Sequence, residues 1–353
     1  MATLNGLIKN LGAADKPVEL MTGPDGTRIL VLPHGGRVLG LFAAGSDENF
    51  LWTHPMLDAV DSARALYRSE DWHNSGGDRV WLAPEADFFF PHFPDTSVYR
   101  QPRQFDPGQY QVERSGDGVR LTNGLTLRSF RAAEDIALRI TRTVEPATNP
   151  LRHERLIPGQ EELRFAGYAL RTTLELAGGK SRTAVGLWNL LQMPHGGQML
   201  IPTYSRTEPR VYFGRIEASD LAVEDRLVRY TMRAPGEAKI GVRAIATTGR
   251  AGYLYFHDSE SCLVIRNFSV DPSGTYVDYP LDAPDDLGWA FQACNVSNEK
   301  LGSFSELEYH VPGIGGATGI ARCEDVSEVW AFRGKAGPIR AVAGLLLGAN
   351  YEA

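Results

Sequence analysis

Three observations predict an all-β protein. The 37 glycines and 21 prolines divide the chain into short apolar runs at intervals of about ten residues. Residues 136–145, IALRITRTVE, alternate apolar and polar side chains, as a half-buried strand does. Between residues 15 and 335 no long segment shows helical spacing. Together these features favour a large antiparallel β-sandwich of two sheets, with roughly a dozen strands.

The N-terminus is the exception to this pattern. Leu4, Leu7, Ile8 and Leu11 lie on one face of a helix, and a glycine follows them, which predicts a short amphipathic helix within residues 1–14. No repeat, low-complexity tract or change of composition divides the chain. We therefore expect a single domain over residues 1–353.

Turn sequences then locate the strands of a sandwich over residues 18–335. GPDG predicts a hairpin between residues 18–21 and 28–32, and SGDG predicts another between residues 110–114 and 119–122. Further strands are expected at residues 163–176, 210–213, 227–232, 239–245, 252–257, 262–268, 304–311 and 328–332. Residues 62–102 lack a clear period and predict a long functional loop. The tail at residues 336–353 is expected either to pack on the domain or to contact a second chain.

Composition excludes several classes of protein. The 43 acidic residues outnumber the 36 basic ones, giving a net charge of −7, which is unfavourable for binding nucleic acid. The longest apolar stretch, residues 341–349, is too short to span a bilayer, and the N-terminus does not resemble a signal peptide. Three cysteines without metal-ligand spacing suit a reducing compartment. We therefore expect a cytoplasmic protein that binds neither membrane nor nucleic acid, with its oligomeric state open.

Common cofactor and nucleophile motifs are missing. The sequence contains no GxGxxG, P-loop, HExxH, CxxC or GxSxG pattern. We therefore expect no cofactor and no catalytic metal.

Two segments in the first quarter of the chain combine polar and aromatic residues around paired glycines. LPHGGRVLGL places Arg37 beside a tight turn, and DWHNSGGDRVWLAPE contains His73, Asp78, Arg79 and Trp81. Aromatic faces together with planar polar side chains are typical of sugar sites, and such residues in a loop favour a function. The alternative is structural, with Asp78 and Arg79 forming an ion pair and Trp81 lying in the core.

Two later segments add groups that could transfer protons. GLWNLLQMPHGGQMLIPT contains Trp188, Gln192 and His195, and a histidine titrates near neutral pH. In FSELEYHVP a strand would place Glu306, Glu308 and His310 on one face. In a cleft, one of these carboxylates could raise the pKa of the other; on an outer surface they would only be solvated.

These four segments, in this order, resemble those of the galactose mutarotase-like superfamily, which includes the aldose 1-epimerases. The resemblance covers roughly residues 18–335 and is nearest to uncharacterised members. It implies a β-supersandwich with a sugar site on a concave sheet face. It further implies an acid histidine in mid-chain and a C-terminal base glutamate, which open the sugar ring so that it recloses as the other anomer.

Residue by residue, the resemblance makes His195 the acid and Glu306 or Glu308 the base. Nearby side chains would bind the substrate: Arg37, His73, Asp78, Arg79, Trp81, Trp188, Gln192 and His310. Two features depart from the family pattern, since MPHGG differs from the usual context of the histidine and two glutamates replace one.

Three functions remain as hypotheses. The leading one is a cofactor-independent enzyme of the aldose 1-epimerase type. The others are a glycosidase or polysaccharide lyase on the same fold, and a sugar-binding protein without catalysis. Each implies a small-molecule or oligosaccharide ligand.

Overall fold

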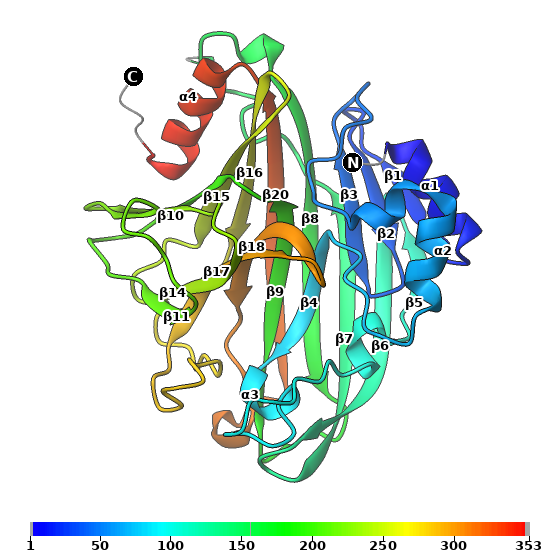
Figure 1. Cartoon of the computed structure of the whole chain (residues 1–353), viewed down its shortest axis with the longest axis vertical. Coiled ribbons are helices and arrows are strands. Elements are labelled where there is room, and N and C mark those ends of the chain that lie inside the picture. The colour runs from blue at the N-terminus through cyan, green and yellow to red at the C-terminus, as the bar shows by residue number, and fades with distance from the viewer. Residues whose placement is uncertain (1–2, 156, 350–353) are drawn as a thin grey trace.

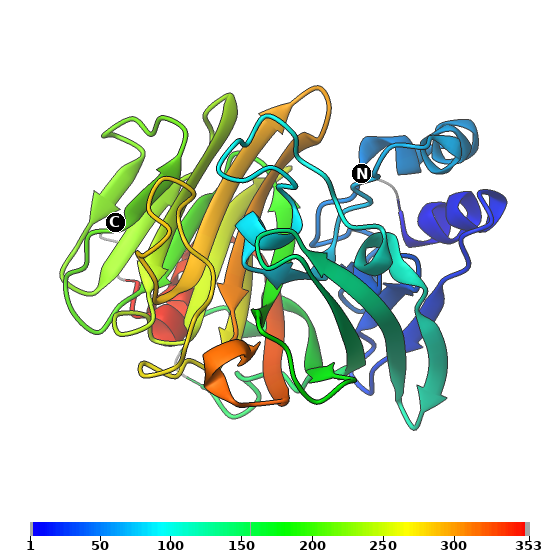
Figure 2. The same cartoon turned by 90° about the horizontal axis from the view of Figure 1, so that it is seen from below.

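A computed structural model describes residues 3–155 and 157–349. Residues 1–2 of the predicted N-terminal helix and residues 350–353 of the predicted tail lie outside this part. Within it, two antiparallel sheets of ten strands each pack face to face (Figures 1 and 2). The predicted all-β fold is therefore confirmed.

The strands of the two sheets are as follows. The first sheet has the order β1 (Glu19–Thr22), β2 (Arg28–Leu32), β3 (Arg37–Phe42), β4 (Asp78–Ala83), β9 (Ala184–Pro194), β18 (Gly302–His310), β17 (Trp289–Asn298), β14 (Gly236–Arg243) and β11 (Arg210–Phe213), with β19 (Ile314–Gly315) paired to β9. The second sheet has the order β12 (Leu221–Val223), β13 (Leu227–Thr231), β10 (Gln198–Pro202), β15 (Arg250–His257), β16 (Glu260–Phe268), β20 (Arg322–Gly334), β8 (Arg164–Leu176), β7 (Glu134–Pro146), β6 (Gly118–Ser129) and β5 (Gln111–Ser115).

Apolar side chains from both sheets form the main core between them. Ile136, Leu138 and Ile140 of β7 lie in it, as their alternation predicts. The strands β4, β9 and β17, by contrast, were not predicted. Nearly all their residues are buried on both faces, so their sequences lack the alternation that marks a half-exposed strand.

Helices cover the outer faces of the sheets. The predicted N-terminal helix is α1 (Leu4–Ala13), and it packs with α2 (Val60–Arg68) against β2 and β3 (Figure 1). Near the C-terminus, α4 (Ala336–Leu347) packs its apolar side chains on β16 and β20, so this part of the tail is a packed helix. In the described part of the chain, no helix has the length and hydrophobicity needed to cross a membrane.

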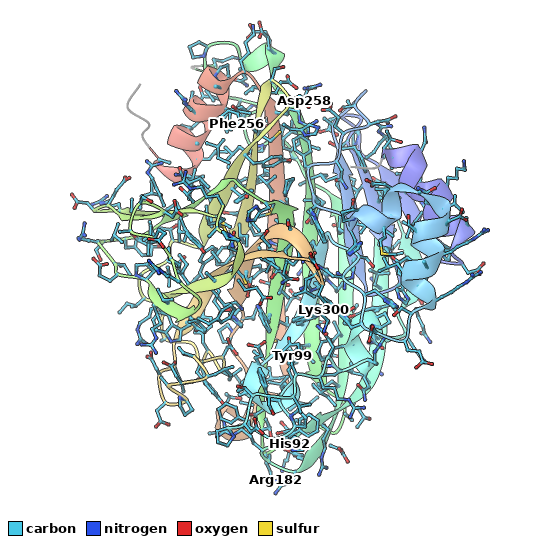
Figure 3. All side chains as sticks on the ribbon, in the orientation of Figure 1. His92, Tyr99, Arg182, Phe256, Asp258 and Lys300 are labelled. Carbon is cyan, nitrogen blue, oxygen red and sulfur yellow. The ribbon has the colours of Figure 1, made fainter. Side chains whose placement is uncertain are left out.

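A segment over residues 84–108 covers part of the outer face of the first sheet. It contains α3 (Glu85–Phe88) and the short helical turn η2 (Gln104–Gly108). Phe89 packs against Trp81 of β4 and Trp188 of β9, with ring centroids 5.1 and 6.2 Å apart. Tyr99, labelled in Figure 3, stacks on Phe89 at 5.4 Å. We call residues 84–108 the covering segment.

Candidate active site

Polar side chains converge on the outer face of the first sheet. Glu306, Glu308 and His310 alternate along β18 and share this face, as the sequence pattern predicts. The strand register then places Gln192 of β9 opposite Glu306 and Trp188 opposite His310. The resulting cluster is buried, although it lies on the side of the sheet away from the main core.

Glu306 is held by two donors. Arg79 Nη2 of β4 and Gln192 Nε2 both donate to Glu306 Oε1 at 2.9 Å. The Arg79 guanidinium also lies over the Trp81 ring, 4.4 Å from its centroid. Both described hydrogen bonds of Glu306 use one oxygen, which leaves Oε2 available to a ligand. Glu306 is 6% exposed, so the cluster borders the surface here.

Glu308 lies deeper and has a different environment. Its Oε2 accepts hydrogen bonds from Trp188 Nε1 at 2.7 Å and from Lys239 Nζ of β14 at 3.0 Å. Its Oε1 is buried and has no hydrogen-bond partner within residues 3–155 and 157–349. Burial raises the pKa of Glu308 to about 7; Lys239 opposes this increase, and the nearby Glu306 adds to it. Near neutral pH, Glu308 can therefore either give or take a proton.

His310 is a neutral imidazole in the same cluster. Its ring stacks on Trp188 at a centroid distance of 5.6 Å, and its Nε2 lies 3.8 Å from Asp278 Oδ2. Burial lowers the pKa of His310 to about 4, so the ring is uncharged at neutral pH. Among the described residues neither ring nitrogen has a hydrogen-bond partner, so both are available to a polar ligand.

A carboxylate that was not predicted as a site residue binds the tryptophan side chains of the cluster. Asp106 in the covering segment accepts hydrogen bonds from Arg37 at 2.9 Å, Trp72 Nε1 at 3.0 Å and Trp81 Nε1 at 2.8 Å. Arg37 therefore acts on the site through Asp106, which fixes the two indole rings.

Residues 5–352 match the model of DUF6786, a family of unknown function. The chain belongs to this family. No curated protein matches the sequence.

Solved structures are similar to this DUF6786 chain only distantly. A galactose mutarotase-related enzyme from Lactobacillus acidophilus has 10% identity and a TM-score of 0.41, over 90% of this chain and 97% of its own. A GalM/aldose epimerase homologue from C. elegans has 9% identity and a TM-score of 0.42, over 91% and 99%. A galactose 1-epimerase from L. acidophilus NCFM has 10% identity and a TM-score of 0.42, over 89% and 93%. Function is therefore inferred from this chain's own residues.

Asp78 lies away from the cluster. It is on the inner face of β4, where its carboxylate pairs with Arg142 at 2.9 Å and with Arg266, and accepts a hydrogen bond from Tyr168 at 2.6 Å. Adjacent strand residues point to opposite faces, so Asp78 neither pairs with Arg79 nor faces a ligand beside it. Its expected place in the sugar site is corrected: in the DUF6786 chain it joins the two sheets.

Two predicted histidines also lie outside the cluster. His195 follows β9, and its Nε2 lies 3.3 Å from the carbonyl oxygen of Ala234, with no described contact to Glu306 or Glu308. His73 packs edge-on against Tyr67, with centroids 5.6 Å apart. Neither is part of the site proposed below.

The cluster has further members, besides Asp106, that were not predicted from the sequence. Asp278 accepts hydrogen bonds from Gln292 Nε2 at 2.9 Å and from the Glu85 backbone at 3.0 Å, and Gln292 accepts one from Lys239 at 3.2 Å. The one available signal was Lys239, a charge at the start of a predicted strand. Asp106 lies in the short turn η2 and Asp278 in a loop, and at neither position does a sequence period indicate where the side chain points.

A possible metal-ligand set overlaps the cluster. Cys294 of β17, Glu306 and Glu308 each offer a ligand atom, and these atoms lie within 4.8 Å of one another. However, Arg79 and Lys239 already neutralise the two carboxylates. Burial also raises the pKa of Cys294 well above its usual value, which disfavours the thiolate that a metal requires. These residues therefore fit a metal ion poorly.

Proposed function

We propose that the cluster binds a free sugar and interconverts its anomers without a cofactor, as an aldose 1-epimerase does. The observation that carries this proposal is the pair Glu306 and Glu308, two neighbouring carboxyl groups with different environments. Two titratable groups that differ in this way are the usual arrangement of an acid and a base in one site.

The pair assigns the direction of proton transfer. Glu306, which faces two donors, takes the proton of the anomeric hydroxyl through its available Oε2. Glu308, which is partly protonated near neutral pH, gives its proton from Oε1 to the ring oxygen. The bond between the anomeric carbon and the ring oxygen then breaks and leaves an aldehyde and a hydroxyl. After rotation of the aldehyde, Glu306 returns its proton to the carbonyl oxygen and Glu308 recovers its own as the ring closes.

Other members of the cluster would hold the sugar. Arg79 and Gln192 donate near the base, and His310 offers nitrogen atoms without partners next to the acid. Trp81 and Trp188 supply indole surface between them, with ring centroids 5.4 Å apart. In this arrangement His310 replaces His195 as the histidine beside the carboxylates.

A ligand reaches the deep end of this cluster only after the structure opens, and we propose that the covering segment is the part that moves. Glu308 is fully buried, and Phe89 packs on both tryptophans that flank it. Opening would separate Tyr99 and Phe89 from the sheet, and closure over a sugar would exclude water from the reacting groups.

The test is NMR exchange spectroscopy with a panel of free monosaccharides, which reads binding and anomeric exchange together. Wild-type protein should accelerate exchange for at least one sugar. Glu308→Gln and Glu306→Gln should each lower that rate by about 100-fold or more while sugar affinity changes little. Glu113→Gln, an exposed site on β5, is the matched control and should retain full activity. Unchanged rates in both active-site variants would refute the proposal, and binding without exchange by the wild-type protein would indicate a sugar-binding protein.

The separation of the two carboxylates favours a second candidate. One carboxylate oxygen of Glu306 and one of Glu308 lie no more than 4.8 Å apart, which is shorter than the roughly 6.5–9.5 Å of inverting glycosidases and leaves the closer spacing of those that retain anomeric configuration. Release of a reducing sugar from glycosides, lost in both glutamine variants, would support hydrolysis instead of anomer exchange.

A further inference from the structure

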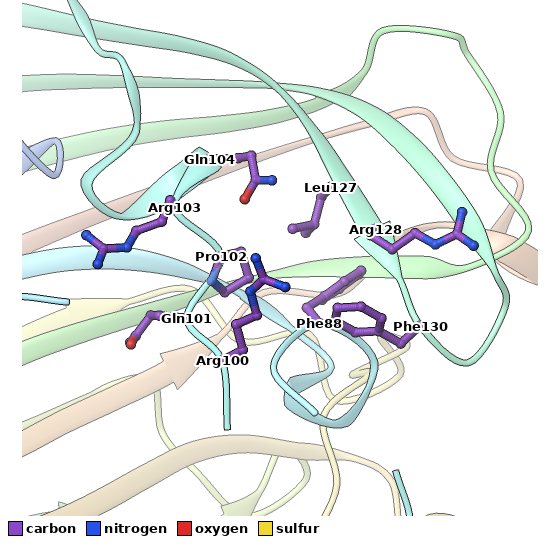
Figure 4. Close-up of a pocket in the computed structure, with 9 residues that line it drawn as sticks. All are labelled: Phe88, Arg100, Gln101, Pro102, Arg103, Gln104, Leu127, Arg128 and Phe130. Carbon is purple, nitrogen blue, oxygen red and sulfur yellow. The ribbon is translucent and has the colours of Figure 1, made fainter. Parts of the chain in front are cut away.

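A pocket of about 320 Å³ lies outside the cluster of Glu306 and Glu308. Residues 100–104 of the covering segment form one wall, and the end of β6 with Phe88 and Phe130 forms the other (Figure 4). This volume is at the lower end of the range for small-molecule sites, so it suits a ligand of one or two rings.

The lining of this pocket combines cationic groups with an apolar floor. Phe88, Leu127 and Phe130 supply the apolar surface, while the charged residues of the lining, Arg100, Arg103 and Arg128, are all cationic. This local charge contrasts with the net charge of −7 for the whole chain. A concave surface lined by charges of one sign concentrates ions of the opposite sign.

Arg100 is the central cation. In Figure 4 the Arg100 side chain is drawn near the middle of the lining, next to Pro102, whereas Arg103 and Arg128 lie on either side. Arg128 pairs with Asp135 at 3.2 Å, and Arg103 donates to the backbone of Glu70, whereas no side-chain partner is described for Arg100. Its backbone N–H donates to Phe89 O at 2.8 Å, which fixes the base of the side chain. The backbone of Arg100 is therefore anchored beside the pocket, and its guanidinium is available to an anion.

A second polar group in the wall also lacks a partner. Gln101 Nε2 is buried without a hydrogen bond in the described part of the chain. A buried donor without a partner costs free energy that a ligand acceptor would recover. Gln101 and Gln104 thus add two carboxamide groups to the lining of the pocket.

We propose that this pocket is a binding site for an acidic sugar, with its carboxylate on Arg100. The apolar face of the sugar ring packs on Phe88 and Phe130, and the hydroxyl groups bond to the carboxamides. Guanidinium and carboxylate form charge-assisted hydrogen bonds, which are stronger than neutral ones. The site does not depend on catalysis by Glu306 and Glu308.

The experiment is calorimetric titration of the full chain with glucuronate, glucose, glucose 6-phosphate and inorganic phosphate. Glucuronate should bind at least about tenfold more tightly than glucose, the effect of one charge-assisted contact. Tighter binding of glucose 6-phosphate than of glucuronate would show that the pocket prefers a phosphate ester, and would refute the proposal that Arg100 binds a carboxylate. Equal affinity for glucuronate and inorganic phosphate would show that the pocket binds an anion without recognising the sugar ring, and would refute the proposal.

Two variants locate the site. Arg100→Gln should reduce glucuronate affinity about tenfold and leave glucose affinity unchanged, and its thermal unfolding should match the wild type because the side chain is exposed. Arg120→Gln, also exposed and on the same strand as Arg128, is the control and should bind like the wild type. Equal glucuronate affinity in wild type and Arg100→Gln would refute the proposal. Arg100-dependent binding without anomeric exchange would support this site and contradict only the proposed catalysis.

Discussion

Lys239 Nζ lies 3.0 Å from Glu308 Oε2, although β14 and β18, which carry these residues, are separated by β17. Glu306 lies on the same face of β18 as Glu308, two residues away. Glu308 is thus placed between a cation that lowers its pKa and a carboxylate that raises it, and burial decides the balance in favour of the raised value of about 7. This three-residue arrangement sets the pH range in which the proposed chemistry operates.

Removing the cation should move that range. Lys239→Met eliminates the interaction that lowers the pKa of Glu308, so this pKa should rise above 7. The proposed acid form of Glu308 is present below its pKa and lost above it. The wild-type rate of anomeric exchange should therefore fall as pH rises through about 7, and in the variant the fall should occur at least about one pH unit higher. Rates measured from pH 5 to 9 test this, and an unchanged or lowered midpoint would contradict the assignment of Glu308 as the acid.

Asp78 should matter for stability. Its carboxylate is fully buried and forms ion pairs with both Arg142 and Arg266, so Asp78→Asn removes the salt-bridge partner of two buried cations. Loss of one member of a buried ionic network costs about 3–5 kcal/mol of unfolding free energy. Urea denaturation measures this loss. Asp135→Asn, whose carboxylate is exposed beside Arg128, is the control and should change stability by less than about 0.5 kcal/mol. A similar small change in Asp78→Asn would show that the network is not needed for folding.

The sequence predicted a position when a period of two or a turn motif constrained it. The alternation in FSELEYHVP correctly placed Glu306, Glu308 and His310 on one face of β18. No such period marks β4, which is buried on both faces, so the sequence did not indicate which of Asp78 and Arg79 faces the other sheet. That choice depends on Arg142 and Arg266, which come from strands distant in sequence.

Contacts across several strands could not be predicted in the same way. Lys239 reaches Glu308 because β14 and β18 both pair with β17, and this strand order follows from the whole topology. Asp106 lies in the short turn η2, whose course has no sequence period. His195 seemed favourable because histidine titrates near neutral pH, but its place beyond the end of β9 directs it to Ala234.

The paired glycines of NSGGDR make a further prediction. Gly77 has φ +76°, and an added Cβ would lie 2.3 Å from the Val38 carbonyl oxygen. Gly77→Ala should therefore lower stability by both backbone strain and steric clash, together more than about 2 kcal/mol. Gly116→Ala is the matched control, because its φ is +58° but no atom lies within 4 Å of the added Cβ. Thermal unfolding should show a clearly larger loss for Gly77→Ala, and equal losses would exclude the clash with Val38.

His310 should make stability depend on pH in acid. Burial lowers its pKa from 6.5 to about 4 in the folded protein, so the unfolded chain binds a proton more readily between these values. Above pH 6.5 the effect of His310 on the free energy of unfolding is constant. As pH falls toward 4, protonation of the unfolded chain lowers this free energy, and the loss is about 2 kcal/mol at pH 5. His310→Phe keeps a ring against Trp188 but cannot titrate. Urea denaturation at pH 5 and pH 7.5 should therefore show a smaller loss of stability in acid for this variant than for the wild type.

His153→Asn, at an exposed position, is the control and should lose as much stability in acid as the wild type. If His310→Phe also loses as much, His310 accepts its proton in the folded protein as easily as in the unfolded chain, and the neutral imidazole proposed beside Glu308 would be wrong.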